Sequence, residues 1–244
     1  MLQQTDLESV KATAKALLMT DIHQSQMSPI VHHPFTSTAI VAIQTNGKTE
    51  VLNLLANPDN LTKWQKTMSE LIDNAKNPFA IFAMVNKPYL LTMLKYSMAY
   101  LSKADFSNIL ANSWLDSEAP NRDVNVTKKQ LVAMFKKADA HYLMTEEERK
   151  IFDRLEDPVT VYRGVTPYNN DNIRALSWTT NLPTAKWFAT RFADRGTVYE
   201  ALIEKKHILA YFDSRHEFEV VVDPKHLTNI IDMQVMSEDF TFKL

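Results

Sequence analysis

The chain contains no cysteine and only three glycines among its 244 residues. The absence of cysteine excludes disulfide bonds, thiol nucleophiles and metal centres held by thiolates, so the functional groups must be oxygen or nitrogen atoms. The sequence also lacks a Gly-x-Gly-x-x-Gly motif, a Gly-Lys-Ser/Thr phosphate loop, a Gly-x-Ser-x-Gly nucleophile elbow and a His-Glu-x-x-His zinc motif. These absences exclude the commonest sequence signatures of nucleotide-binding loops, serine hydrolases and zinc proteases.

An excess of positive charge is lacking as well. The formal net charge is −2 and the sequence pI is about 6.4, so no global positive field draws the chain to nucleic acid or to an anionic membrane. The net charge does not exclude a local basic groove. Of the seven histidines in the sequence, only His32 and His33 are adjacent. Because adjacent side chains point in different directions, we expect no metal site there.

The N-terminus lacks the basic stretch and apolar core of a secretory signal. The longest apolar stretch, residues 78–85, is too short to span a bilayer. We therefore expect a cytoplasmic protein without a membrane partner.

The first 157 residues combine a hairpin pattern with a helical region. Two apolar runs at 38–44 and 49–55 flank Asn46-Gly47, which is typical of a tight β-turn. A weak helical pattern precedes them at 5–19. Five further helices are expected at 61–75, 88–102, 104–116, 127–141 and 145–156, and the last opens with the capping box Thr145-x-x-Glu148.

After Pro158 the sequence becomes rich in strand patterns. Strands are expected near 159–164, 176–180, 197–203 and 216–222, with a helical stretch at 182–193. The pattern predicts an α+β protein, with residues 1–157 as a hairpin and helical region packed on a core of residues 158–244. We expect the two parts to form one compact catalytic domain.

Two acids stand one residue apart in the last of these strand patterns. Residues i and i+2 of a strand share a face, so Glu217 and Glu219 are expected to point the same way. Like charges raise each other's pKa, and this arrangement favours a functional site over a purely structural one. The alternative for each acid is an exposed surface charge.

Upstream of the acids, the run Val159–Gly164 ends in Tyr-Arg-Gly, and Ser177-Trp178-Thr179-Thr180 ends in hydroxyls. The order Arg163, Ser177, Glu217-x-Glu219 resembles the mono-ADP-ribosyltransferases of the Arg-Ser-Glu type, in the Glu-x-Glu subgroup, a fold shared by many bacterial toxins and phage-encoded modifying enzymes. The resemblance covers residues 158–224, about a quarter of the chain. It implies a split, mixed or antiparallel NAD-binding sheet and a glycosyltransferase that uses NAD as its substrate and no metal.

The resemblance assigns a role to each motif residue. Glu219 would stabilise the cation-like ribose as nicotinamide leaves, and Glu217 would position and deprotonate the acceptor. Arg163 would grip the pyrophosphate or ribose, or alternatively salt-bridge an acid across the sheet. Ser177 would bond the catalytic carboxylate. The family's Ser-Thr-Ser element is replaced here by Ser-Trp-Thr, so Trp178 is expected in the core and Thr179 supplies the second hydroxyl.

Further NAD contacts are expected around these strands. A ligand could approach the bare backbone of Gly164. The segment that follows the helical stretch offers arginines for phosphate and phenylalanines for nicotinamide, although an amphipathic helix would instead bury its aromatic residues. The candidates are Arg191, Arg195, Phe188 and Phe192, and the aromatic residues with the core alternative are Trp187, Phe188 and Phe192.

The acceptor is a macromolecule in this interpretation. Protein arginine is the first candidate acceptor of ADP-ribose, nucleic-acid bases are the second, and small molecules or water are the third. Tyr211 or Phe212, just before the acids, would contact the acceptor if exposed and would only pack if buried. An antitoxin or immunity protein is a conceivable partner of a toxin. The alternative of a different class is a non-catalytic interaction domain that retains the fold.

Overall fold

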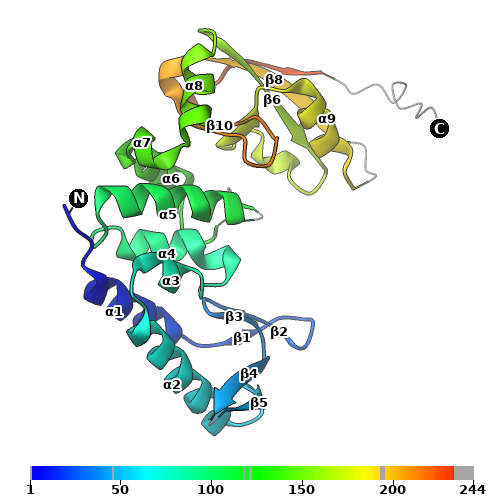
Figure 1. Cartoon of the computed structure of the whole chain (residues 1–244). Helices are drawn as coiled ribbons and strands as arrows, with labels where there is room; N and C mark the ends of the chain where they lie inside the picture. The colour runs from blue at the N-terminus through cyan, green and yellow to red at the C-terminus, as the bar shows by residue number, and fades with distance from the viewer. Residues whose placement is uncertain (1, 46, 118, 121–122, 193–195, 234–244) are drawn as a thin grey trace. The chain divides into compact units, whose positions relative to one another are not determined.

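The computed structural model describes residues 2–45, 47–117, 119–120, 123–192 and 196–233 (Figure 1). It combines α-helices with antiparallel strands, which confirms the α+β class. The chain divides into two compact units, Met1–Val126 and Thr127–Leu244. Among the described residues, no helix has both the length and the apolar character that a membrane span requires.

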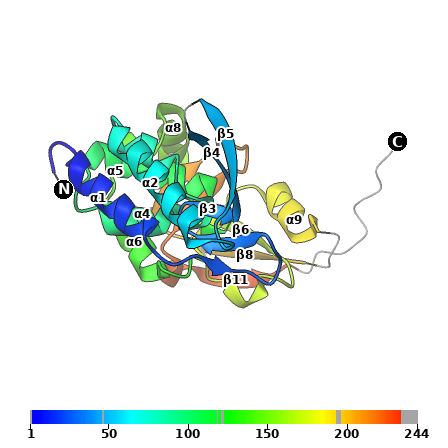
Figure 2. The same cartoon turned by 90° about the horizontal axis from the view of Figure 1, so that it is seen from below.

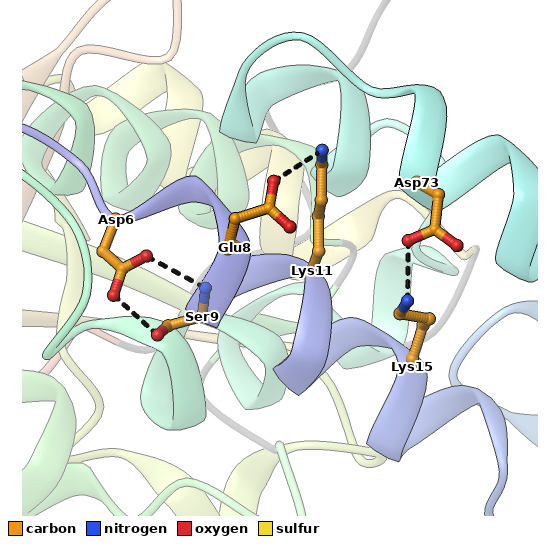
Figure 3. Close-up of polar contacts among 6 residues, drawn as sticks. All are labelled: Asp6, Glu8, Ser9, Lys11, Lys15 and Asp73. Atoms are coloured by element: carbon orange, nitrogen blue, oxygen red, sulfur yellow. Dashed lines mark hydrogen bonds and ion pairs between the residues drawn. The ribbon is translucent and has the colours of Figure 1, made fainter.

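The first unit is mainly helical. Its helix α1 begins where the Asp6 carboxylate accepts a hydrogen bond from Ser9 N at 3.1 Å, and Lys15 joins α1 to α2 through Asp73 at 2.6 Å (Figure 3). The buried residues Val10, Leu94 and Leu110 show that α1, α4 and α5 contribute to the apolar core. The helices are α1 Leu7–Leu18, α2 Pro58–Asn74, α3 Pro78–Phe82, the 3₁₀ turn η1 Lys87–Tyr89, α4 Leu90–Ser97 and α5 Lys103–Asp116.

The strands of the first unit form two small sheets. The expected hairpin is confirmed as β4 Ile40–Thr45 and β5 Lys48–Asn53, with Gly47 at φ 73° in the turn. The sheet β1-β2-β3 was not expected from the sequence. Its strands are only two to four residues long, so they carry little periodicity: β1 His23–Gln24, β2 Ile30–His33 and β3 Thr36–Thr38.

The second unit contains a six-stranded antiparallel sheet in the order β11-β8-β6-β7-β10-β9. Figures 1 and 2 show its paired strands β6 and β8 side by side. The expected strands at 159–164, 176–180 and 197–203 are confirmed, whereas β9 and β11 were not expected. The strands are β6 Val159–Val165, β7 Ser177–Thr179, β8 Thr197–Ile203, β9 Ile208–Phe212, β10 Glu219–Val222 and β11 Thr228–Asp232. Its helices are α6 Lys128–Lys137, α7 Ala140–Leu143, α8 Glu146–Arg154 and α9 Leu182–Thr190, with 3₁₀ turns η3 Asn170–Asn172, η4 Lys205–His207 and η5 Pro224–His226.

The boundary between the units lies after Val126, whereas the sequence placed a boundary after Asp157. Helices α6 and α8 belong with the sheet because their polar side chains reach it. Lys136 of α6 forms an ion pair with the buried Asp223 at 2.6 Å, and Glu148 of α8 accepts a hydrogen bond from Asp213 N at 2.9 Å. The helical pattern alone did not distinguish helices that pack on the sheet from those that pack on α1.

Helix α9 lies close against β6 and β8 (Figure 1). A Cβ atom on Gly164 would overlap the carbonyl oxygen of Ala185 and lie 2.6 Å from Ala189 N. A Cβ on Gly196 would overlap the carbonyl oxygen of Ala189. Both glycines are thus required by the approach of the helix backbone to the sheet.

We predict that Gly164→Ala lowers the free energy of unfolding by about 1–3 kcal/mol, because the added methyl group must displace α9 or the strand. Gly196→Ala should act in the same direction. Gly47→Asn is the control, since Gly47 has open space around it and asparagine tolerates a left-handed φ. Urea denaturation followed by circular dichroism measures the effect, and an unchanged midpoint for Gly164→Ala would contradict the close packing.

Candidate functional site

Strand β7 brings the expected site residues together. It lies between β6 and β10, with Thr179 opposite Glu219 on one side and opposite Tyr162 on the other. Arg163, Ser177 and Glu219 therefore lie on three neighbouring strands, although β8 and β9 come between β7 and β10 along the chain.

The junction between β6 and β7 is narrow. Strand β6 pairs with β8 from Val159 to Val165, whereas within the described residues it pairs with β7 at Tyr162 and Thr179 alone. The sheet thus consists of two three-stranded halves, β11-β8-β6 and β7-β10-β9, joined at one point. The candidate site lies at this junction.

The guanidinium of Arg163 bridges the junction. On the β10 side, Thr180 N donates to Phe218 O at 3.0 Å and Val222 N donates to Leu176 O at 2.8 Å. Because hydrogen-bonded and non-hydrogen-bonded pairs alternate, the main-chain groups of Ser177 point toward β6. Arg163 Nη1 donates to Ser177 O at 2.6 Å, so the side chain takes the place of a main-chain hydrogen bond where the strands separate.

Neighbouring residues of β6 start toward opposite faces of the sheet. Residues directly opposite each other share a face, so Tyr162, Thr179 and Glu219 lie on one face, together with Gly164 and α9. Alternation along β6 places Arg163 on the opposite face. Arg163 contacts the motif through the backbone carbonyl of Ser177 in β7.

Glu219 is the first residue of β10 and is 8% exposed. It lies opposite Thr179 of β7 and Phe212 of β9, and it forms a non-hydrogen-bonded pair with Thr179, in which side chains approach most closely. Both neighbouring residues are buried. The carboxylate is thus held on a paired strand in a largely dry environment.

The expectation that Glu217 shares a strand face with Glu219 is wrong. Strand β10 begins at Glu219, and Glu217 lies in the preceding loop between His216 at φ 55° and Phe218 at φ 50°. These left-handed residues break the alternation of an extended strand. Glu217 is half-buried, so the two acids occupy different environments.

The two hydroxyls of β7 differ in position. Ser177 lies opposite Val221, so Thr179 is the one directly opposite Glu219. Thr179 Oγ1 donates to Glu217 O at 2.7 Å and accepts from Asn181 N at 3.0 Å. Its single proton therefore holds the Glu217 backbone. The expectation that Trp178 is core is confirmed, since it is buried and its Nε1 donates to Ala175 O at 3.0 Å.

The aromatic residues around the end of α9 form a second cluster. Trp187 is 57% exposed and Phe192 is 58% exposed, so the alternative that they form an apolar core is wrong. The Arg191 guanidinium lies 4.7 Å from the Phe192 ring centroid and 5.0 Å from that of Phe188. Arg195 lies outside the described residues. The cluster lies at the C-terminal end of α9 and in the two residues after it, whereas the N-cap residue Asn181 is the one bonded to Thr179.

Tyr211 and Phe212 of β9 are buried, so both pack rather than offer an acceptor surface. Burial raises the pKa of Tyr211 to about 12, and the charges of Asp213 and Glu148 act in the same direction. Within the described part of the chain, no group of three or more histidine or acidic side chains could hold a metal ion.

Sequence reasoning missed the contacts made by Glu148 and Asp213. Glu148 was recognised only as the end of a capping box, and that box is confirmed. Its carboxylate also accepts from Asp213 N at 2.9 Å, and the Asp213 carboxylate accepts from Phe218 N at 3.1 Å. The first contact joins residues distant in sequence and the second lies within an irregular loop, so neither leaves a periodic pattern.

Comparison of the chain with protein-family models, with curated proteins and with solved structures finds no match. The functional interpretation therefore depends on the residues and their geometry.

We predict a specific alkaline loss of stability from Tyr211. A folded-state pKa of about 12 against an ordinary value of 10.0 means that the neutral phenol is favoured in the folded protein. The contribution of the neutral Tyr211 phenol to the free energy of unfolding is complete below pH 10. It is lost as the pH rises toward 12, at about 1.4 kcal/mol for each pKa unit. Urea midpoints measured between pH 9 and 12 should fall less steeply for Tyr211→Phe than for the wild type. Tyr142→Phe, which removes an exposed hydroxyl, is the control, and equal slopes for Tyr211→Phe and the wild type would contradict the prediction.

Proposed function

We propose that this protein is an NAD-dependent mono-ADP-ribosyltransferase that transfers ADP-ribose to a macromolecular acceptor and releases nicotinamide. One observation carries the proposal: Arg163, Ser177 and Glu219 lie on the neighbouring strands β6, β7 and β10. The motif was defined by its order along the chain alone. A chance occurrence of these residue types would not require their strands to be adjacent.

The narrow β6–β7 junction supports the finer fold assignment. A split-sheet NAD-binding core needs two sheet halves that part near the motif, and here they are joined at Tyr162 and Thr179. The substrate would lie at this junction, where main-chain pairing gives way to side chains.

The chemistry begins at the glycosidic bond between ribose C1′ and the nicotinamide nitrogen. As the bond breaks, its electron pair leaves with nicotinamide and positive charge develops on the ribose. Glu219 is held on a paired strand and is largely buried, and a carboxylate in such an environment stabilises a nearby cation more strongly than one in water.

Glu217 suits the second half of the reaction. The acceptor nitrogen forms a bond with C1′ and loses a proton, which a nearby carboxylate accepts. Glu217 is less buried than Glu219 and lies in a loop, where an acceptor side chain can reach it. The buried strand position of Glu219 suits an acid that acts on the ribose, and the half-buried loop position of Glu217 suits an acid that acts on the acceptor.

NAD binding is assigned to Arg163, Thr179, Arg191 and Phe192. The expectation that a ligand approaches the bare backbone of Gly164 is wrong, because the backbone of α9 occupies that side of the glycine. The Arg163 guanidinium donates to Ser177 O, and its planar set of N–H donors has the geometry that phosphate recognition requires. The packing of α9 is a sufficient reason for the glycine at position 164. Arg191 and Phe192 offer a cation and an aromatic face.

Protein arginine is the leading acceptor, because a half-exposed carboxylate such as Glu217 can bind a guanidinium through two parallel hydrogen bonds. A nucleic-acid base is the second candidate. The exposed Trp187, Phe192 and Arg191 favour it, because bases stack on exposed aromatic and guanidinium planes.

We predict that Glu219→Gln and Glu217→Gln separate the two half-reactions. Glu219→Gln removes the charge that stabilises the ribosyl cation, so nicotinamide release should fall roughly 10²–10³-fold. Glu217→Gln should retain much of the hydrolysis of NAD and lose transfer to the acceptor. Nicotinamide release and label transfer from NAD labelled in its ADP-ribose moiety to cell lysate measure the two activities.

Glu156→Gln, at an exposed position between α8 and β6, is the matched control and should leave both activities unchanged. Dividing the labelled lysate between protease and nuclease identifies the acceptor class. Near-native NAD cleavage by Glu219→Gln would refute its assignment, and a wild-type protein that releases no nicotinamide would favour the non-catalytic interaction domain.

We also predict that Arg163→Lys weakens NAD binding although it keeps the charge. An ammonium cannot hold Ser177 O and form two parallel bonds to phosphate, so the loss should be on the order of 1–3 kcal/mol. Calorimetry measures the affinity. Arg174→Lys is the control, because Arg174 bonds the carbonyls of Pro224 and Leu227 instead. Unchanged affinity in Arg163→Lys would make Arg163 a purely structural residue.

A further inference from the structure

The loop of residues 213–218 connects β9 to β10 and contains Glu217. The pair Phe212 and Glu219 closes the loop at its base. His216 and Phe218 both adopt left-handed φ values, at 55° and 50°. Non-glycine residues keep such values only where surrounding contacts enforce them, so the contacts of this loop determine where Glu217 lies.

Asp213 makes three of these contacts. Its carboxylate accepts a hydrogen bond from Phe218 N at 3.1 Å, its carbonyl accepts from His216 N at 2.9 Å, and its own N–H donates to Glu148 Oε1 at 2.9 Å. The first two contacts enforce the two left-handed residues directly. The third fixes the start of the loop to helix α8.

Glu148 connects the helix to the loop through its two carboxylate oxygens. Oε2 accepts from Thr145 N at 2.9 Å and caps α8, while Oε1 accepts from Asp213 N. A buried carboxylate is suited to this task because both of its oxygens accept hydrogen bonds. A glutamine has one accepting oxygen, and its amide group would face an N–H donor.

The last residue of β7 and the residue after it hold the other end of the loop. Thr179 Oγ1 donates to Glu217 O at 2.7 Å, and Thr180 N donates to Phe218 O at 3.0 Å. The backbone around Glu217 is therefore held from β7 and from the Glu148–Asp213 pair. Glu219 depends less on the pair, because β7 and β9 fix it by strand pairing.

We propose that Glu148 and Asp213 are positioning residues that hold Glu217 for transfer to the acceptor. The inference rests on the proposed function for the role of Glu217. It adds an acid on a helix and an acid at the start of the loop, both outside the Arg-Ser-Glu motif. Neither residue is required to touch NAD or the acceptor.

The test compares Asp213→Ala with Asp213→Asn. Alanine removes the acceptor of Phe218 N–H, while the asparagine oxygen retains it. We expect Asp213→Ala to lower transfer at least about tenfold, with NAD hydrolysis within about twofold of the wild type, because small displacements of a reacting group are costly. Asp213→Asn should restore transfer. An unchanged ratio of transfer to hydrolysis in Asp213→Ala would overturn the proposal, as would an asparagine variant as impaired as the alanine one.

Amide hydrogen exchange at Phe218 gives a second readout that does not require activity. Asp213→Ala should lose protection of this amide and Asp213→Asn should keep it, while unchanged protection in Asp213→Ala would overturn the proposal. Glu148→Gln should reduce the transfer ratio like Asp213→Ala, and Glu147→Gln, an exposed acid in the same helical turn, should not. A wild-type protein without nicotinamide release would refute the proposed function, and the exchange pattern would still decide whether Asp213 holds the loop.

Discussion

The pairing of β10 with β7 on one side and β9 on the other is the constraint on which the candidate site depends. It places a carboxylate, Glu219, at the start of a strand whose remaining residues are all buried. Burying a charge is costly unless the surroundings stabilise it, so the environment of Glu219 is set by the strands on either side of it. Ser177, Thr179 and the loop that carries Glu217 all take their positions from this pairing.

The close approach of α9 to the sheet is a second constraint, and it acts on the same residues. The helix can lie against β6 only because positions 164 and 196 lack side chains. Its N-cap residue Asn181 lies two residues after the end of β7, and its N–H donates to Thr179, which in turn donates to the Glu217 carbonyl. Packing of the helix and placement of the loop are thus connected through one threonine.

The sequence predicted those features that depend on local pattern. The capping box of α8, the hairpin around Gly47, the limits of β8 and the burial of Trp178 follow from residue type and short periodicity. Strands β9 and β11 were missed because turns and irregular register dilute their alternation. Burial in the core was the alternative for Trp187 and Phe192, because helical periodicity predicts an apolar face but does not show which element covers that face. The contacts of Glu148 and Asp213 join separate segments, which no local pattern encodes.

The error at Glu217 is the most informative for function. A Glu-x-Glu pair on one strand would place two carboxylates side by side in one environment, with the repulsion that this implies. The left-handed residues at 216 and 218 instead place Glu217 in a half-buried loop and leave Glu219 on the paired strand. Each such residue costs on the order of 1–3 kcal/mol, which the contacts of Asp213, Thr179 and Thr180 must offset. The structure thereby separates the environments of two acids that the sequence places one residue apart, and this separation is what allows the proposed function to give them different roles.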